Sequence, residues 1–368
     1  MATTLLLDED AKMLRESAGR FFAEADTLKK LRARRDARDL AAQARGEWDG
    51  MVELGLPGLL IPEDEGGSGL GAVAGCQVAE MMGRSLAAGP FVASAVMAAT
   101  AVALGDNAAL KASLSPRIAS GLVVVLAAEE TARHNPDALT TEAVRDGAGF
   151  RLIGRKCAVI GGNIASKLIV SARLDGTPTL FLVDAGAAGV TIDAHLGVDS
   201  DPVVAVTLNE AEAEAVVGPA ALLDRIYDIG RLHLAAEMLG AAQEAFDRTV
   251  EYLKTRVQFG RPIGEFQALQ HRAAILFGNL EVARSVTLKA AITFDAGGAK
   301  AAEMVSLAKA RVGEIAKHAT AEAIQLHGGI GMTDDFDLGF YLKRVRALAE
   351  SLGDTAFHME RYARLRGL

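Results

Sequence analysis

The stretch TRVQFGRPIGEFQALQHR, residues 255–272, sets arginines among phenylalanines and glycines and then runs into a polar segment rich in Gln and His. Arg256 lies three residues before Phe259, and Gly260 follows, where the absence of a side chain lets the backbone turn tightly. Taken alone, the stretch is compatible with a solvated charge at a helix end and a phenylalanine packed in the core. What it does has to be inferred from the rest of the chain.

The regions on either side of this stretch differ in their periodicity. Residues 1–117 show apolar side chains at helical spacing, for example Leu14, Ala18 and Phe21. Residues 118–216 contain short β-rich runs broken by Gly, Asp and Pro, with no long helical segment between them, which predicts an antiparallel barrel or sandwich. Residues 217–368 return to long helical patterns with short glycine-containing breaks, which predict a four-helix bundle. The predicted fold class is α+β with three domains in this order.

Composition excludes several classes of protein. Half of the 368 residues are hydrophobic and 23% are charged, as in globular proteins, and the net charge of -8 argues against nucleic-acid binding. Two cysteines are too few for a disulfide framework, so we expect a reducing, cytoplasmic location. The scattered histidines lack the H-E-x-x-H spacing, and we expect no metal. The uncharged segment 85–105 is rich in Ala and predicts a buried helix starting near Pro90, with a membrane helix as the alternative.

Two motifs together resemble the acyl-CoA dehydrogenase family. They are RVQFGRPIGEFQALQHR at 256–272 and IQLHGGIGMT at 324–333. WDGMVELGLPGLLIPEDEGGSGLG is similar to the family's N-terminal signature, and TTEAVRDGAGFRLIGRK to its β hairpin, so the resemblance covers nearly the whole chain. The segments HGGIGMTDDFDLGFYLKR and LGDTAFHMERYA resemble the branch of the pimeloyl-CoA dehydrogenase small subunit and similar subunits of heteromeric enzymes.

The resemblance implies FAD as cofactor, held partly by a neighbouring subunit. Arg256 matches the arginine that meets the FAD pyrophosphate, for which a planar, always charged donor is suited. Phe259 would cover the adenine. A second adenosine-contacting element would comprise the residues Gln325, Gly328 and Gly329.

The resemblance also implies a substrate contact. Asp228 and Arg231 match the family's Asp-x-x-Arg at the acyl-CoA site and share one helix face. An ordinary intrahelical ion pair remains the alternative.

The chain departs from the family pattern on the side of the flavin site made within one subunit. LAAEETARHNPDALTTEA replaces the usual flavin-binding loop, and KCAVIGGN replaces the strand whose tryptophan backs the flavin. The single tryptophan of the chain is Trp48. The half of the site made within one subunit therefore differs from the family, whereas the half offered to a neighbour matches it.

The positions at which the family carries its catalytic glutamate are occupied by Leu352 and Gly230. Two carboxylates remain as substitute bases, Asp354 and Glu237. Glu237 lies in an apolar run, which would raise its pKa toward that of a base acting near neutrality. It is seven residues from Gly230, however, or about 10 Å along a helix, so a hydrogen-bonded interface role is the alternative.

These observations predict a subunit of an FAD-dependent acyl-CoA dehydrogenase that acts on an acyl-CoA substrate. A second acyl-CoA dehydrogenase-like subunit, expected in an α2β2 complex, would supply the catalytic Glu. We also expect an electron acceptor flavoprotein as a partner, but neither nucleic acid nor a membrane. Two alternatives stay open: a homo-oligomer that uses a relocated base, and a non-catalytic scaffold or acyl-CoA-binding subunit. The sequence does not identify the acyl chain, which could be fatty, dicarboxylic or a steroid side chain.

Overall fold

The computed structural model describes residues 6–37, 42–147 and 149–368. They form two compact units, each built from segments that lie far apart in the sequence. Unit 1 contains the described residues up to Lys29, Ala72–Ala87 and Arg231–Leu368. Unit 2 contains the described residues of Lys30–Gly71 and Ala88–Gly230. The division into domains 1–117, 118–216 and 217–368 remains a prediction.

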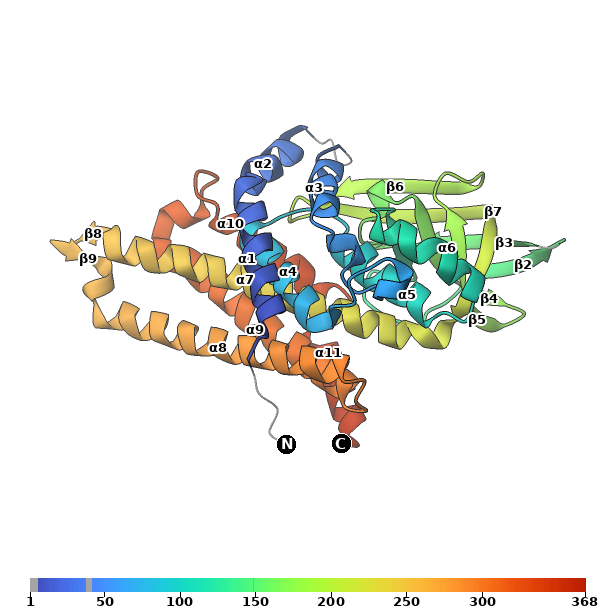
Figure 1. The fold of residues 1–368 in the computed structure, drawn as a ribbon. Helices are drawn as coiled ribbons and strands as arrows, with labels where there is room; N and C mark the ends of the chain where they lie inside the picture. The colour runs from blue at the N-terminus through green and yellow to red at the C-terminus, as the bar shows by residue number, and fades with distance from the viewer. Residues whose placement is uncertain (1–5, 38–41, 148) are drawn as a thin grey trace. The chain divides into compact units, whose positions relative to one another are not determined.

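Unit 1 is dominated by long helices. Its helices, two of which begin at or before the unit boundary, are α1 (Glu9–Glu24), α4 (Gly71–Ser85), α7 (Leu223–Thr255), α8 (Gln267–Asp295), α9 (Ala301–His327), α10 (Leu338–Glu350) and α11 (Thr355–Arg366). A short hairpin of β8 (Val257–Gln258) and β9 (Arg261–Pro262) joins α7 to α8, at the far end of both helices (Figure 1). The predicted C-terminal helical bundle is confirmed.

Helices also dominate the N-terminal part of unit 2. They are α3 (Ala42–Glu53), a π-helix (Phe91–Ala98), α5 (Ala99–Leu104) and α6 (Ala108–Ala119), while α2 (Thr27–Ala37) crosses the unit boundary. The helix predicted for the Ala-rich segment 85–105 begins directly after Pro90, and residues 91–99 are buried. Within the described residues, no helix combines the length and the apolar character needed to span a membrane.

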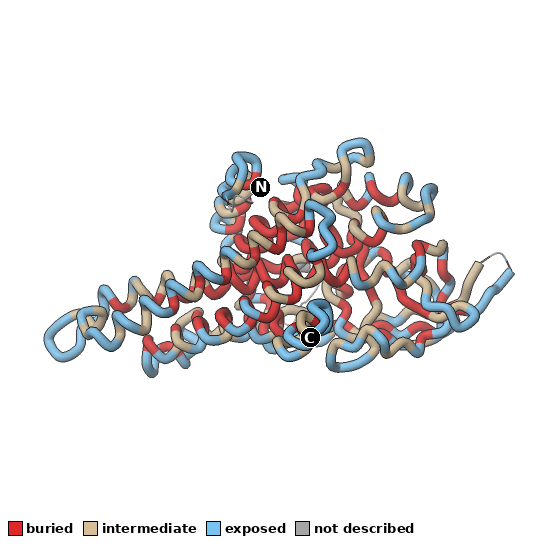
Figure 2. The backbone as a smooth tube through the Cα atoms, turned by 90° about the horizontal axis from the view of Figure 1, so that it is seen from below, coloured by how far each residue is buried: buried red, intermediate tan, exposed pale blue. Residues whose placement is uncertain are grey.

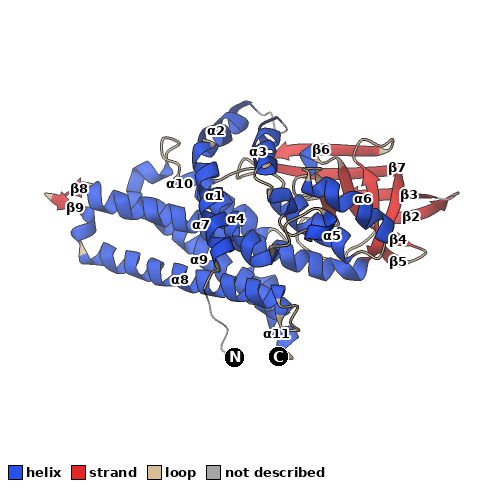
Figure 3. Ribbon diagram, viewed as in Figure 1, coloured by secondary structure: helices blue, strands red, loops and turns tan. Residues whose placement is uncertain are grey.

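The sheet of unit 2 closes on itself. Its strands are the red ones on the right of Figure 3. They are β1 (Val124–Ala127), β2 (Glu142–Asp146), β3 (Gly149–Lys156), β4 (Lys167–Leu174), β5 (Thr177–Asp184), β6 (Val190–Leu196) and β7 (Pro202–Pro219). The pairings run β4–β2–β3–β7–β5 and back to β4, while β1 extends from β4 and β6 from β7. The predicted barrel is therefore present, but an antiparallel description is incomplete because β4 pairs in parallel with β1 and β2.

The longest strand shows how side-chain alternation builds this barrel. In β7, Val204, Val206 and Leu208 alternate inward with period two and are buried. Glu210 then adopts a positive φ of 54°, and burial resumes at Ala211. The register against β3 shifts at the same place, so the extra residue is a β-bulge that bends the long strand around the barrel.

Candidate functional site

The hairpin between α7 and α8 holds the first predicted cofactor element. Phe259 (φ 53°) and Gly260 (φ 80°) are its two turn residues, and both have the positive φ of a type I′ turn. A bulky residue in this conformation is an outlier, and such outliers concentrate at functional sites. The Phe259 side chain is 92% exposed, so it is not the core residue that a purely structural interpretation requires.

The arginines of the hairpin differ in their surroundings. The Arg261 guanidinium stacks over the Phe266 ring at 4.2 Å, and Phe259 meets the same ring edge-on at 6.1 Å. Arg256 is exposed, and the described residues provide no hydrogen-bond or ion-pair partner for its side chain. Its backbone N–H still closes the last turn of α7 on the Tyr252 carbonyl. Arg256 is thus fixed at its backbone, with its charge directed to solvent; the exposed hairpin end appears pale blue in Figure 2.

The second predicted element lies at the C-terminus of α9. Gln325 is exposed, and its carbonyl accepts the N–H of Gly328, which ends the helix with a φ of 66°. A Cβ added at Gly328 or at Gly329 would meet no atom within 4 Å. The backbone there faces open space, which a flat ligand could approach closely. Positive φ at Gly328 explains why a glycine is needed there even without a ligand.

An aromatic cluster joins the two elements and was missed by the sequence reasoning. Tyr252 of α7 stacks on His327 of α9 with ring centroids 4.2 Å apart, and Phe336 lies 5.0 Å from the His327 ring. His327 is buried, which lowers its pKa, and its Nδ1 contacts the Ala323 carbonyl at 2.7 Å. The neutral ring therefore packs as an aromatic group. This contact brings the ends of α7 and α9 side by side, from which both predicted cofactor elements continue.

Glu237, the candidate base on α7, is engaged in a buried ion pair. Its Oε1 accepts a hydrogen bond of 2.9 Å from Arg344 Nη1 of α10, and both side chains are almost fully buried. If Glu237 took up a substrate proton, Arg344 would lose this charged partner inside the fold. This geometry favours the interface role over the catalytic role.

The family's other glutamate position, Leu352, lies in the turn between α10 and α11. Leu352 is 7% exposed and has a φ of 57°. Its carbonyl lies 3.0 Å from Arg231 Nε and 3.2 Å from His358 Nε2. The neighbouring carboxylate Asp354 caps α11 by accepting the Phe357 N–H at 2.8 Å. The Leu352 carbonyl and the Asp354 carboxylate therefore each have a structural partner.

The predicted substrate residues are both buried. Arg231 has no exposed surface, and besides the Leu352 carbonyl its guanidinium faces the Phe357 ring at 5.3 Å. Asp228 is 3% exposed and lies one turn earlier in α7, beside Gly230. In this structure Arg231 stabilises the turn at Leu352, so its assignment to substrate stays a prediction.

The segment that replaces the family's flavin loop is held by its own carboxylates. Glu129 Oε1 lies 2.7 Å from Nδ1 of His134, whose ring contacts Tyr227 edge-on. Glu130 accepts the Lys156 ammonium at 2.6 Å and the Thr141 N–H at 3.0 Å. The single tryptophan, Trp48, is buried and donates to the Gly121 carbonyl, so it serves the core of unit 2.

Lys309 of α9 provides a buried charge beside the Leu352 turn. Its ammonium donates to the carbonyls of Leu348, Ala349 and Gly353 at 2.9 to 3.2 Å. Burial is the main cause, and the nearby charge of Arg231 the next, of the fall of its pKa from 10.5 to about 7. Lys317 acts in the same direction, and the carboxylates Glu350 and Asp354 act in the opposite one.

Stability is expected to depend on pH through Lys309. Between its folded pKa of about 7 and its unfolded value of 10.5, the unfolded chain binds a proton that the native chain does not, so the free energy of unfolding rises with pH. The slope from this group is at most about 1.4 kcal/mol per pH unit. Urea unfolding of wild type and Lys309→Met between pH 6 and 9 measures it. The free energy of unfolding of wild type minus that of Lys309→Met should be constant below about pH 7 and increase above it. A difference that stays constant over the whole pH range would contradict the assignment.

The described residues contain no group of three or more His, Cys, Asp or Glu side chains placed to hold a metal ion.

Comparisons with known proteins agree with this arrangement. Two family models match, the acyl-CoA dehydrogenase N-terminal domain over residues 8–122 and the C-terminal domain over residues 221–365. Acyl-CoA dehydrogenase IpdE2 of Mycobacterium tuberculosis is 31% identical over 94% of this chain and 93% of its own length. The 3-(aryl)acrylate reductase of Clostridium sporogenes is 30% identical over 81% and 84%.

Two solved structures share the fold over nearly their whole length. A variant of the Tcur3481-Tcur3483 steroid ACAD is 32% identical, with a TM-score of 0.88 and 98% of each chain covered. The ChsE4-ChsE5 complex from Mycobacterium tuberculosis is 26% identical, with a TM-score of 0.88 and 99% of each chain covered.

Proposed function

Because the chain belongs to the acyl-CoA dehydrogenase family of oxidoreductases, we propose that it is one subunit of a heteromeric, FAD-dependent acyl-CoA dehydrogenase. The partner is a second acyl-CoA dehydrogenase-like chain, and the assembly is α2β2. The observation that carries this proposal is an asymmetry within one chain. Arg256, Phe259, Gln325, Gly328 and Gly329 are exposed, whereas Glu237, Asp354 and the Leu352 carbonyl have partners inside the fold.

The residues of the hairpin and of the α9 turn fit the pyrophosphate and adenosine parts of FAD. Arg256 would bind the pyrophosphate, since its charge has no partner among the described residues and a guanidinium can donate two parallel bonds. Phe259 would lie against the adenine, and the open backbone at Gly328 and Gly329 would admit the adenosine. Bound FAD supplies the acceptor for the electrons removed in α,β-dehydrogenation.

The removal of the α-proton is assigned to a carboxylate of the partner subunit. Within this chain, Leu352 presents an apolar side chain, and Glu237 and Asp354 are held in an ion pair and a helix cap. The likeness to a steroid ACAD supports a steroid acyl group as substrate. An electron acceptor flavoprotein would reoxidise the complex.

Purification of the chain alone and after co-expression with its partner tests this proposal. We expect no bound flavin in the chain alone, and stoichiometric flavin absorbance with acyl-CoA turnover, assayed with a dye acceptor, in the complex. Flavin and turnover in the chain alone would establish the homomeric enzyme instead. Flavin in neither preparation, with acyl-CoA binding retained, would establish the non-catalytic scaffold.

Glu237→Gln is expected to leave turnover of the flavin-loaded complex within a few-fold of wild type. Loss of a true general base costs about 10²–10⁴ in rate. The substitution keeps size and hydrogen-bonding capacity, but it removes the charge opposite Arg344, so unfolding by urea is measured alongside. A thousand-fold loss of rate in a folded, flavin-loaded variant would make Glu237 the catalytic base.

A further inference from the structure

Unit 1 contains a cavity that the proposed function does not use. Its volume is about 410 Å³, within the range of small-molecule pockets. It is lined by residues of α1, α4, α7 and α8, which lie together in Figure 1, and by Leu6 and Leu7 just before α1. None of the predicted cofactor, substrate or base residues lines it. The cavity is therefore distinct from the positions predicted for FAD and acyl-CoA.

The greater part of the cavity wall is apolar. It is formed by Cys76 of α4, by Ala236 and Leu239 of α7, and by Leu288 and Ala291 of α8. Ala236 and Ala291 are buried, and their small side chains leave the space between the helices open. A flexible hydrocarbon chain would gain about 25 cal/mol for each Å² of apolar surface that it buries here.

One side of the cavity carries cationic groups in excess. Glu80 is 3% exposed and accepts both Arg15, at 2.8 and 2.9 Å, and Arg284. Two guanidinium groups thus share one carboxylate. Lys12 also lines the cavity, and the lining residues together carry three positive charges and one negative charge.

The carboxylates outside the lining offset this excess only in part. Glu9 pairs with Lys12 but its side chain is 83% exposed, and Glu281 lies 3.7 Å from Arg284 Nε and is 52% exposed. Exposed pairs of this kind contribute little because water screens them. Arg15 and Arg284 are more than two-thirds buried, so their field acts in a less polar environment.

We propose that this cavity binds a small amphiphile with an anionic head group, of the class of medium-chain carboxylates. The hydrocarbon chain lies between Leu239, Leu288 and Ala291, and the head group lies beside Arg15, Arg284 and Lys12. Gln77, which accepts a hydrogen bond from Arg15 at 2.9 Å, adds a polar group on the same side. The assignment does not depend on the reaction or on the partner subunit.

Cys76 serves as a reporter because it lines the cavity and is 2% exposed. Burial raises the pKa of its thiol, so modification at neutral pH is slow and depends on access to the cavity. Cys157→Ser removes the other cysteine of the chain. In this background, decanoate is the probe, and modification of Cys76 by a small uncharged disulfide reagent is followed with time. Decanol and decylamine are compared with decanoate, and equilibrium dialysis gives the affinity.

Decanoate at about ten times its Kd is expected to slow the modification about tenfold, because the unoccupied fraction falls as 1/(1 + [L]/Kd). Decanol and decylamine should bind at least several-fold more weakly. Equal protection of Cys76 by all three compounds would contradict the preference for an anionic head group. If millimolar decanoate did not protect Cys76 at all, the proposed site would be wrong. Flavin loading and turnover are unaffected by either outcome, so failure here is distinct from failure of the proposed function.

Two variants with a matched control locate the binding. Leu288→Trp fills the cavity from α8 and should abolish protection, whereas Ile275→Trp places the same side chain on α8 outside the lining and should not. Lys12→Gln removes a cationic group without touching the Arg15–Glu80 pair and should weaken decanoate more than decanol. If decanoate still protected Cys76 in a folded Leu288→Trp variant, the hydrocarbon chain would not lie in this cavity. If Lys12→Gln weakened decanoate and decanol binding equally, the head group would not lie beside Lys12.

Discussion

Gly83→Ala is expected to destabilise unit 1 by about 3 kcal/mol, toward the upper end of the usual cost of overpacking. A Cβ at Gly83 of α4 would lie 1.9 Å from the Glu237 carbonyl oxygen of α7, and a Cβ at Gly240 would lie 1.9 Å from the Glu80 carbonyl oxygen. Each helix thus presents a glycine to the backbone of the other. Backbone atoms cannot rotate away as a flexible side chain can, so the helices would have to separate. Urea unfolding, with the midpoint and slope compared to wild type, measures the loss.

Gly313→Ala is the matched control. Gly313 is also buried within a helix, α9, but a Cβ there would lie 3.5 Å from Thr355 Oγ1, which is ordinary contact. Alanine is favoured over glycine in a helix interior by about 1 kcal/mol, so this variant should be as stable as wild type or more so. Equal stability of the two variants would show that the α4–α7 crossing adjusts freely. The crossing matters for function because it positions Glu80 at the cavity and Glu237 opposite Arg344.

The sequence predicted element types well because their periodicity is local. The alternation in β7 and the long apolar repeats of α7, α8 and α9 each depend on neighbours within two to four positions. It did not predict the parallel pairings of β4, because which strands become neighbours depends on chain crossings rather than on alternation. The two compact units were not foreseen either, since each joins segments separated by tens of residues.

The same difference between local patterns and long-range contacts applies to the candidate site. The residues Arg256 and Phe259 were selected from a contiguous motif, and the hairpin conformation gives a physical reason for their exposure. The roles of Glu237 and Arg231 depend on Arg344 and on the Leu352 carbonyl, each more than 100 residues away. The sequence signalled that Glu237 was unusual, as a carboxylate in an apolar run, but not which residue neutralises it. His327 lies in a motif that the sequence singled out, but nothing local to it indicated that it stacks on Tyr252, 75 residues away.

Arg256→Ala is expected to weaken FAD binding by the assembled complex about ten- to a hundred-fold. One hydrogen bond to a charged group contributes about 1.5–3 kcal/mol, and each 1.4 kcal/mol is tenfold in affinity. The loss should fall on the cofactor and not on folding, because the described residues give the Arg256 side chain no partner within the chain. Titration of FAD into the flavin-depleted complex gives the Kd, and urea unfolding gives the stability.

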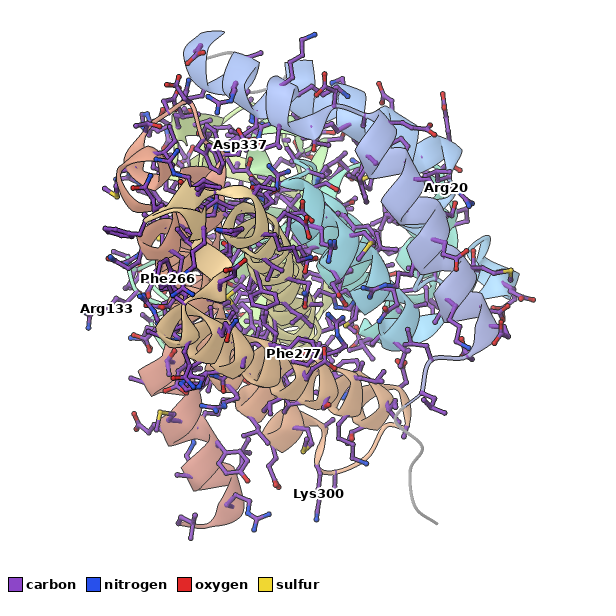
Figure 4. The ribbon with its side chains drawn as sticks, turned by 90° about the vertical axis from the view of Figure 1, so that its left-hand side faces the viewer. Arg20, Arg133, Phe266, Phe277, Lys300 and Asp337 are labelled. Atoms are coloured by element: carbon purple, nitrogen blue, oxygen red, sulfur yellow. The ribbon has the colours of Figure 1, made fainter. Side chains whose placement is uncertain are left out.

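Two further variants separate the contact from the general charge of the hairpin. Arg256→Lys keeps the charge but not the planar pair of donors, so its Kd should lie between wild type and Arg256→Ala. Arg261→Ala removes an equal charge from the same hairpin, but Arg261 is already stacked over the Phe266 ring, and its effect should be smaller. Figure 4 views the helices from the hairpin end, with Phe266 labelled there and Phe277 on α8. Equal weakening by Arg256→Ala and Arg261→Ala would indicate a diffuse electrostatic effect. An unchanged Kd in Arg256→Ala would remove the hairpin from the cofactor site and, with it, the main physical support for a cofactor shared between subunits.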